Sequence, residues 1–198
     1  MEFENLVVES FQESVEVKDR FIKRYSKHIV DLSNKITKRI REGGGVFFMG
    51  NGGSAADAAH LTAELIGMFY KRRKPIRALS LATNPSILTE IPNDFGFEYL
   101  FERQVEAHVI SKDVVIGIST SGKSVNVVRA LKKAKAIGAL TVGFTGESIG
   151  EMNELCDVIL KADSKKVPRI QEVHILLGHI LCQLVEIQLF GGDQCDGV

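Results

Sequence analysis

The sequence predicts one α/β domain: a five-stranded parallel sheet flanked by helices, with an N-terminal helical extension. From residue 46 onward, five short apolar runs alternate with longer segments of helical character. Loops rich in glycine or serine follow the first and third of these runs. The chain has 198 residues, 44% of them hydrophobic, which is enough for one ordinary core. Alternating β and α elements are typical of a parallel sheet covered on both faces.

The N-terminal region, residues 1–42, is expected to contain two helices. Between residues 3 and 42 the chain is charged and carries apolar residues at helical spacing, and Gly43 begins the glycine run that ends the second helix. Residues 43–190 form the α/β core with a C-terminal helix, and residues 191–198 form a frayed tail. All 198 residues are therefore assigned to a single domain.

Within the core, the apolar runs place strands at residues 46–49, 78–81, 114–118, 140–144 and 158–160. Helices are expected at 54–68, 98–109, 124–137, 149–155 and 168–190, and Pro168 suits the first turn of the last one. Ligands of open parallel sheets bind at the carboxyl ends of the strands. The loops after residues 49 and 118 are therefore the first candidates for a functional site.

Composition narrows the classes of protein. Lysine plus arginine and aspartate plus glutamate each total 25, so no global basic field would attract nucleic acid or an anionic membrane. The basic run Lys71–Lys74 is interpreted as a solvated loop. The three cysteines, Cys156, Cys182 and Cys195, form neither a disulfide framework nor a cysteine zinc site, which fits a reducing cytosol. We see no signal peptide and no apolar run of transmembrane length, and expect a cytoplasmic protein.

The first candidate loop is Gly50-Asn51-Gly52-Gly53-Ser54, between a strand and a helix. Its glycines would let backbone N–H groups approach an anion at the start of the helix. A tight turn with Ser54 as the N-cap explains the same residues equally well.

The second candidate loop has four hydroxyls at the start of a helix: Ser119, Thr120, Ser121 and Ser124. Hydroxyl and amide donors at a helix N-terminus suit a phosphate group. A helix cap needs only one hydroxyl, so the phosphate interpretation is favoured. A third loop, with Asn93 and Asp94 after Pro92, is by itself an ordinary turn.

The segment Gly117–Ser124 also matches the nucleotide P-loop pattern G-x-x-x-x-G-K-[ST]. A nucleotide-binding protein is therefore a second hypothesis, and two observations rank it below the first. Gly117 lies inside an apolar run and is expected within the strand rather than at the turn. No later strand ends in a clear magnesium-binding aspartate; Asp163 is the nearest candidate.

Four polar residues on two apolar helices could supply chemistry. His60 and Glu64 are four apart and share a helix face, and Gln171 and His179 are eight apart on the last helix. Gly178 would allow close approach of another backbone. Two imidazoles, a carboxylate and an amide oxygen could bind a divalent metal such as zinc, or provide a general base and acid. The remaining histidines, His28, His108 and His174, are assigned surface or structural roles.

These motifs together resemble a known family. They are similar to the motifs of the phosphoheptose isomerases, which have the sugar isomerase (SIS) fold. The four motifs are G-N-G-G-S-x-x-D-x-x-H-x-x-x-E at 50–64, N-D-F-G-F at 93–97, I-S-T-S-G-x-S at 118–124 and R-I-Q-E-V-H-x-x-x-x-H at 169–179. Lys123 departs from the family, where this position is commonly asparagine. The resemblance implies a homotetramer with active sites between subunits. It also implies conversion of D-sedoheptulose 7-phosphate to D-glycero-D-manno-heptose 7-phosphate, a precursor of bacterial surface polysaccharides such as lipopolysaccharide.

The resemblance also implies roles for individual residues. Glu64 and His179 would be the catalytic acid/base pair for proton transfer through an enediol. One zinc ion per subunit would be bound by His60, Glu64, Gln171 and His179. Substrate-binding residues would be Ser119, Thr120, Ser121 and Ser124 at the phosphate, with Asn51, Gly52, Gly53, Ser54, Glu64, Asn93, Asp94 and Gln171 around the sugar.

Two further readings stay open at this point. Some SIS proteins that resemble this chain are tetrameric, non-catalytic adaptors for the replication initiator, and they lack the carboxylate and imidazole that correspond to Glu64 and His179. Both residues are present here, which favours an enzyme. Other SIS isomerases act on pentose or hexose phosphates, and the sugar length is read from resemblance alone.

Overall fold

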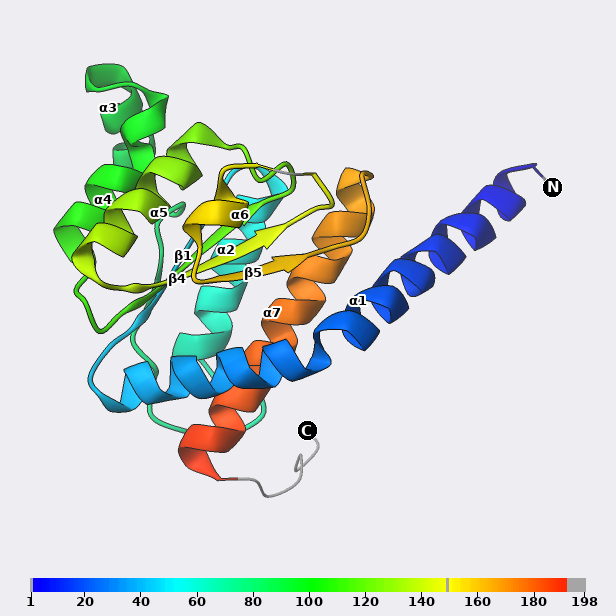
Figure 1. Cartoon of the computed structure of the whole chain (residues 1–198), viewed down its shortest axis with the longest axis horizontal. Coiled ribbons are helices and arrows are strands. Elements are labelled where there is room, and N and C mark those ends of the chain that lie inside the picture. The colour runs from blue at the N-terminus through cyan, green and yellow to red at the C-terminus, as the bar shows by residue number, and fades with distance from the viewer. Residues whose placement is uncertain (1, 149, 192–198) are drawn as a thin grey trace.

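The structure is a computed structural model that describes residues 2–148 and 150–191. Its centre is a five-stranded sheet in which every neighbouring pair is parallel, in the order β2-β1-β3-β4-β5 (Figure 1). The strands are β1 (Val46–Gly50), β2 (Ala78–Ser80), β3 (Val114–Ser119), β4 (Leu140–Thr145) and β5 (Val158–Lys161). The predicted fold class is confirmed, with strand bounds within a residue of those expected.

Helices cover both faces of the sheet because side chains alternate along each strand. Phe48, Ile116 and Phe144 pack in one apolar cluster with α1 (Glu2–Arg41), α2 (Gly53–Ile66) and α7 (Val167–Phe190). Phe47 and Val115 point to the opposite cluster, with α4 (Leu100–His108) and α5 (Val125–Ile137). The short elements are α3 (Pro85–Asp94), the 3-10 turn η1 (Phe97–Tyr99) and α6 (Met152–Leu155).

The N-terminal region is one helix of 40 residues, so the prediction of two helices is wrong. The sequence between residues 2 and 41 contains no glycine or proline to end a first helix, and its buried residues follow one helical stripe. From Val17 onward this stripe packs on the body of the protein, whereas the first four turns project from it (Figure 1). Phe3 and Phe11 on the projecting part are 81% and 71% exposed.

Two other helix predictions need adjustment at their starts. The helix expected from Glu98 begins as the 3-10 turn η1 and continues as α4. The helix expected at 149–155 begins at Met152, and Ile149 lies outside the described residues. Most of the predicted frayed tail, including Cys195, also lies outside them.

Helix α7 is long and apolar enough to cross a membrane, contrary to our expectation that no such run exists. It is, however, a core helix, because Ile170, Val173, Leu177, Leu181 and Val185 are buried against the sheet and α1. One helix of this kind is weak evidence for a membrane span.

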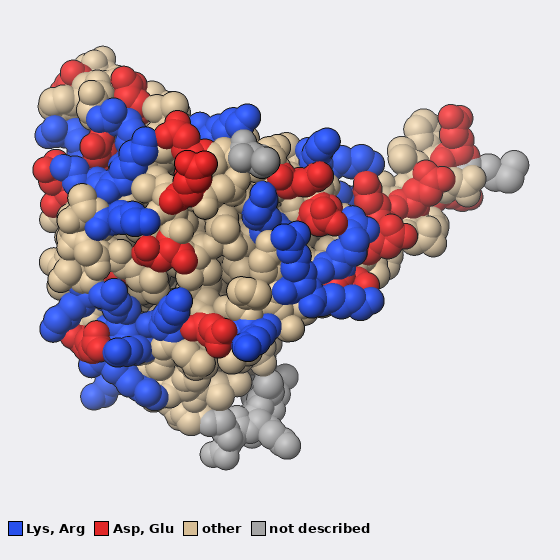
Figure 2. Space-filling model, in the orientation of Figure 1, with Lys and Arg blue, Asp and Glu red and all other residues tan. Residues whose placement is uncertain are grey.

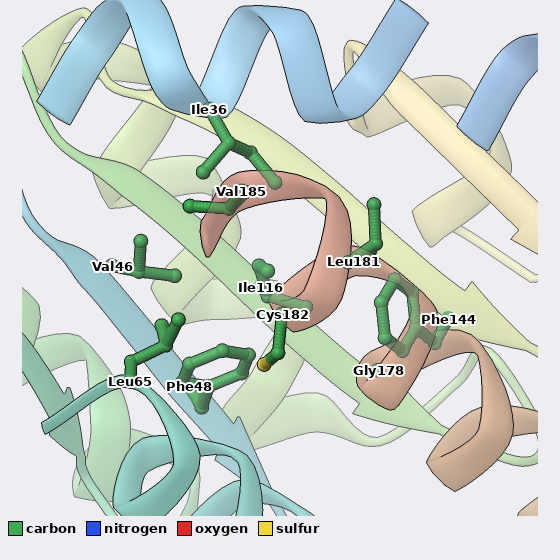
Figure 3. Close-up of a pocket in the computed structure, with 10 residues that line it drawn as sticks. All are labelled: Ile36, Val46, Phe48, Leu65, Ile116, Phe144, Gly178, Leu181, Cys182 and Val185. Carbon is green, nitrogen blue, oxygen red and sulfur yellow. The ribbon is translucent and has the colours of Figure 1, made fainter. Parts of the chain in front are cut away.

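A small cavity lies in the core beneath α7, with a volume of ≈ 10 Å³ (Figure 3). A buried water needs at least this much room and two or more polar partners. Only the Cys182 thiol offers a polar atom from a side chain, and burial raises its pKa to about 12. The cavity is therefore a packing void and not a ligand site. Its lining is Ile36, Val46, Phe48, Leu65, Ile116, Phe144, Gly178, Leu181, Cys182 and Val185.

Candidate active site

Three ionisable side chains meet where α2 crosses α7. A Cβ at Gly178 would overlap the side chain of Leu61, so glycine at this position lets the two helices come together. We predicted that Gly178 would allow close approach of another backbone, but its close neighbour is the side chain of Leu61. Because His60 precedes Leu61 and His179 follows Gly178, this contact also brings the two imidazoles together.

His60, Glu64 and His179 form a compact triad at this crossing. The Nε2 atom of His60 is 2.9 Å from Nε2 of His179 and 3.0 Å from Oε1 of Glu64. The side chains of His60 and Glu64 are 49% and 23% exposed, so the triad is open to solvent on one side. All three ligand atoms lie within 4.8 Å of one another.

The donor set of the triad fits a divalent metal. Zinc binds imidazole nitrogen and carboxylate oxygen at about 2.0–2.2 Å, so neighbouring ligand atoms in a tetrahedral site lie about 3.3 Å apart. The observed separations of 2.9 and 3.0 Å are close to that value. Two nitrogen atoms and one carboxylate oxygen already converge, and small outward movements would admit an ion.

The triad opens into a surface cavity of ≈ 520 Å³, within the usual range for a small-molecule site. Phe69 and Tyr70 form one wall, and the Phe69 ring centroid lies 5.9 Å from that of His179. The full lining is His60, Glu64, Phe69, Tyr70, Leu176, His179, Ile180 and Gln183.

Gln171 lies apart from the triad in this chain. A Cβ on Gly53 would meet the Gln171 amide, which places that amide at the start of α2. Gly53 precedes His60 by seven residues, or about 10 Å along a helix. Among the described residues, Gln171 makes no hydrogen bond with the three triad side chains. The subunit by itself therefore assembles three of the four predicted metal ligands.

The loop after β3 gathers its hydroxyls at the start of α5. The Ser119 hydroxyl lies 2.9 Å from that of Ser124 and 3.4 Å from that of Ser121. Ser124 is the N-cap residue, yet its side chain makes no capping hydrogen bond. The hydroxyl cluster therefore lies at the start of α5, where a helix N-terminus favours an anion, although the N–H of Val127 is already bonded to Asn126.

Gly117 lies inside β3, as predicted, and it pairs with Gly143 of β4. A Cβ there would overlap Val127 and Leu131 of α5, so this glycine serves helix-to-sheet packing. The first glycine of a nucleotide P-loop instead belongs to the phosphate-binding turn. The structure thus disfavours the nucleotide hypothesis on geometric grounds.

The glycine loop differs from the alternative interpretation in which Ser54 caps the helix. Helix α2 begins at Gly53 with Gly52 as the N-cap residue, and Ser54 is buried inside the first turn, so Ser54 is not the cap. Gly52 has φ = 55°, a conformation that glycine adopts without strain. A second cavity of ≈ 290 Å³ lies beside Asn51 and Gly52.

Sequence reasoning missed Asn126, which connects the two loops. The side-chain amides of Asn51 and Asn126 exchange two hydrogen bonds of 2.9 Å each, and Asn126 also accepts one from the N–H of Val127. Asn126 is 1% exposed. The predicted sugar-binding residue Asn51 is therefore held in register with the start of α5.

Asn93 and Asp94 are not in a loop, contrary to the prediction. They form the last turn of α3, which continues through Pro92, and both are exposed. Asn93 donates a hydrogen bond of 2.7 Å to the Asp94 carboxylate. Neither residue lines the cavity beside the glycine loop.

Asp57, on α2 between the glycine loop and His60, was also missed as a candidate. Burial raises the pKa of Asp57 to about 6, and the nearby His60 opposes this shift. Its Oδ2 atom is buried and has no hydrogen-bond partner among the described residues. A buried carboxylate oxygen without a partner is typical of a functional region.

His174 has the structural role predicted for it. It is 1% exposed, and its Nε2 donates a hydrogen bond of 3.1 Å to the Thr145 carbonyl at the end of β4. Burial lowers the pKa of His174 to about 4, from an ordinary value of 6.5. Between pH 6.5 and 4 the unfolded chain therefore binds a proton that the folded chain does not, and acidification destabilises the fold.

We expect His174→Gln, which keeps a donor for Thr145 but does not titrate, to reduce this loss of stability. Between pH 7.5 and 5.0 the wild type should lose about 2 kcal/mol more unfolding free energy than the variant. Asp57 acts in the opposite direction in both proteins, because its raised pKa makes acidification stabilising. Urea unfolding at the two pH values measures the difference, and equal pH dependence would contradict the assignment.

The fold and site define a sugar isomerase (SIS) domain protein. Residues 10–146 match the family described as SIS domain. A phosphoheptose isomerase of Aquifex aeolicus (strain VF5) is 51% identical over 176 residues, covering 89% of this chain and 92% of the relative. Solved phosphoheptose isomerases from Neisseria gonorrhoeae (36% identity, TM-score 0.88) and Francisella tularensis (28%, 0.90) each cover 93% of this chain, and 98% of each structure is matched. The chain belongs to the phosphoheptose isomerase family.

Proposed function

We propose that this chain is an aldose-ketose isomerase that converts D-sedoheptulose 7-phosphate to D-glycero-D-manno-heptose 7-phosphate. The observation that carries the proposal is the convergence of His60, Glu64 and His179 in an open cavity, in a chain whose relatives are named phosphoheptose isomerases. Membership of that family supports the seven-carbon sugar over pentose or hexose phosphates, and a role in heptose precursor synthesis for surface polysaccharides such as lipopolysaccharide.

The chemistry requires one base and one acid. The Glu64 carboxylate would take the proton from C1 and return it at C2, while His179 exchanges protons with the sugar oxygens. Ser119, Thr120, Ser121 and Ser124 would hold the phosphate at the start of α5 and position the chain of carbons. The residues proposed to bind the sugar are Asn51, Gly52, Gly53, Ser54, Asn93, Asp94 and Gln171.

The donor set supports one zinc ion per subunit, held by His60, Glu64 and His179 with Gln171 as the fourth proposed ligand. When bound, such an ion supplies Lewis-acid polarisation of oxygen atoms. A carboxylate that binds a cation is a weaker base, so the two roles of Glu64 compete. His179 belongs to the same ligand set, so its imidazole would meet the same competition between metal binding and proton transfer.

Incubation with D-sedoheptulose 7-phosphate in D₂O, followed by NMR, tests the function directly. We expect the aldose product, with deuterium entering at C2 through the enediol. Glu64→Gln provides the matched inactive control. Conversion of ribulose or fructose phosphates in preference to the heptulose would overturn the substrate assignment.

We also propose that the protein is a cytoplasmic homotetramer formed by one SIS domain per chain. The support is the projecting part of α1, whose Phe3, Leu6, Val7 and Phe11 are largely exposed. The same part of α1 carries acidic residues, and its C-terminal end is basic (Figure 2). A second copy would cover the apolar face and place opposite charges together.

Leu6→Glu with Phe11→Glu should therefore lower the oligomer mass measured by light scattering, because two charges would be buried in an apolar contact. Asn5→Glu adds one carboxylate at an exposed polar position of the helix and should leave the mass unchanged. A double variant that still has the wild-type mass would show that this face is not the interface.

Lys123 distinguishes the sugar-phosphate hypothesis from the nucleotide one. Its side chain is exposed beside the hydroxyl loop. We expect Lys123→Ala to change the KM for sugar phosphate by a few-fold and to leave kcat largely intact, because only a peripheral charge is lost. In a P-loop protein the same change removes the lysine that contacts the β- and γ-phosphates. Magnesium-dependent ATP binding that is lost in the variant would favour the nucleotide hypothesis.

A further inference from the structure

We propose that a buried ion pair between Arg73 and Glu186 positions Glu64 and the wall of the cavity, which makes Arg73 a positioning residue. This inference rests on the proposed function for its catalytic consequence. Arg73 belongs to the run Lys71–Lys74, which we predicted to be solvated, and for Arg73 that prediction is wrong. The side chains of Arg73 and Glu186 are each 2% exposed.

The Arg73 guanidinium completes the end of α2. Its Nη2 donates to the carbonyl of Glu64 and its Nη1 to the carbonyl of Leu65, both at 2.8 Å. The last carbonyls of a helix lack partners within the helix, and α2 has no basic residue of its own in its last turn. Arg73 therefore supplies the cap and fixes the backbone that carries the Glu64 carboxylate.

Glu186 connects this cap to α7 and to the cavity wall. Its Oε2 accepts from Nε of Arg73 at 2.9 Å, while Oε1 accepts from the N–H groups of Tyr70 and Lys71 at 3.1 and 2.8 Å. Tyr70 and its neighbour Phe69 line the cavity of the triad. One carboxylate on α7 thus holds the end of α2 and the segment that carries the Phe69 and Tyr70 wall of the cavity.

The geometry requires arginine. Four hydrogen bonds leave the guanidinium in fixed directions, to one carboxylate and three carbonyls, and a lysine ammonium cannot reproduce this fork. Stability alone does not explain the pair, because well-packed apolar residues can replace a buried ion pair without loss of stability. What apolar residues cannot replace is the capping of the Glu64 carbonyl and the tethering of the Tyr70 segment.

The test compares Arg73→Lys, Glu186→Gln and the double variant Arg73→Met/Glu186→Met with Arg72→Met, whose side chain is on an exposed neighbouring residue. The double variant removes both buried charges together, so it leaves no unpaired buried charge that could prevent folding. We expect kcat to fall at least ~10-fold with KM within roughly 3-fold of wild type, as for a small displacement of a catalytic group. Arg72→Met should behave as wild type.

A second readout does not depend on activity. In protein labelled with ¹³C-histidine, at fixed pH and in chelator, the NMR signals of His60 and His179 should shift in the three variants of Arg73 and Glu186. The shift is expected because the Glu64 carboxylate moves. Signals of His28 and His108, which lie elsewhere, serve as internal controls. Unchanged His60 and His179 signals in a folded Met/Met variant would overturn the inference. A wild type without isomerase activity would refute the proposed function, and the histidine signals would still decide the positioning role.

Discussion

Glu64→Gln and His179→Ala should each lower kcat by a factor of ~10²–10⁴, the range typical for loss of a general acid or base. Both residues border the open cavity rather than the core, so the subunit should remain folded. Turnover of D-sedoheptulose 7-phosphate, measured with thermal unfolding of each variant, checks the expectation. Gln183→Ala is the matched control, since Gln183 lines the same cavity without an ionisable group.

The same pair separates an enzyme from a non-catalytic adaptor. In an adaptor, Glu64 and His179 would not be needed for binding a partner, and the wild type would show no isomerisation at all. Near-wild-type turnover of either variant would refute the role of that residue. Loss in both variants, with Gln183→Ala unaffected, would support a shared step that needs one base and one acid.

Local patterns predicted the fold because they report directly on backbone structure. The parallel sheet followed from five apolar runs separated by helical segments, and Gly117 was correctly placed inside β3 by its apolar neighbours. The prediction of two helices in place of α1 was wrong. Periodicity reveals a helical stripe, but it does not show that one continuous helix extends beyond the core. Exposure begins before Val17 with no change in helical spacing.

The candidate site was only partly predictable, since side chains on distant elements meet through tertiary packing. Residues four apart on one helix share a face, so His60 and Glu64 could be paired from spacing, and His179 was added with Gln171 from their spacing on the last helix. Gln171 was grouped with them, but spacing along α7 could not show that its amide lies at Gly53. Asn126 and Arg73 escaped notice because their partners, Asn51 and Glu186, are 75 and 113 residues away.

Chelation should lower both activity and thermal stability if His60, Glu64 and His179 hold zinc. The ligands come from two helices that are distant in sequence, so only the folded chain presents them together. A metal that binds only the native state stabilises it by RT ln(1 + [M]/Kd), which is about 2.7 kcal/mol at a hundredfold excess over Kd. Because imidazole binds metal only when it is neutral, acidification should release the ion and abolish this added stability.

Elemental analysis of untagged protein should find one zinc per chain, and His60→Ala should lose it together with the shift in melting temperature caused by chelator. Gln171→Leu separates the ligand sets: it should weaken zinc binding if Gln171 joins the triad in the assembled protein, and leave it intact if the triad alone holds the ion. Metal well below one equivalent, with full activity in chelator, would refute the metal site. The three side chains would then serve as a hydrogen-bonded acid/base cluster, because the loss expected in Glu64→Gln does not depend on the ion.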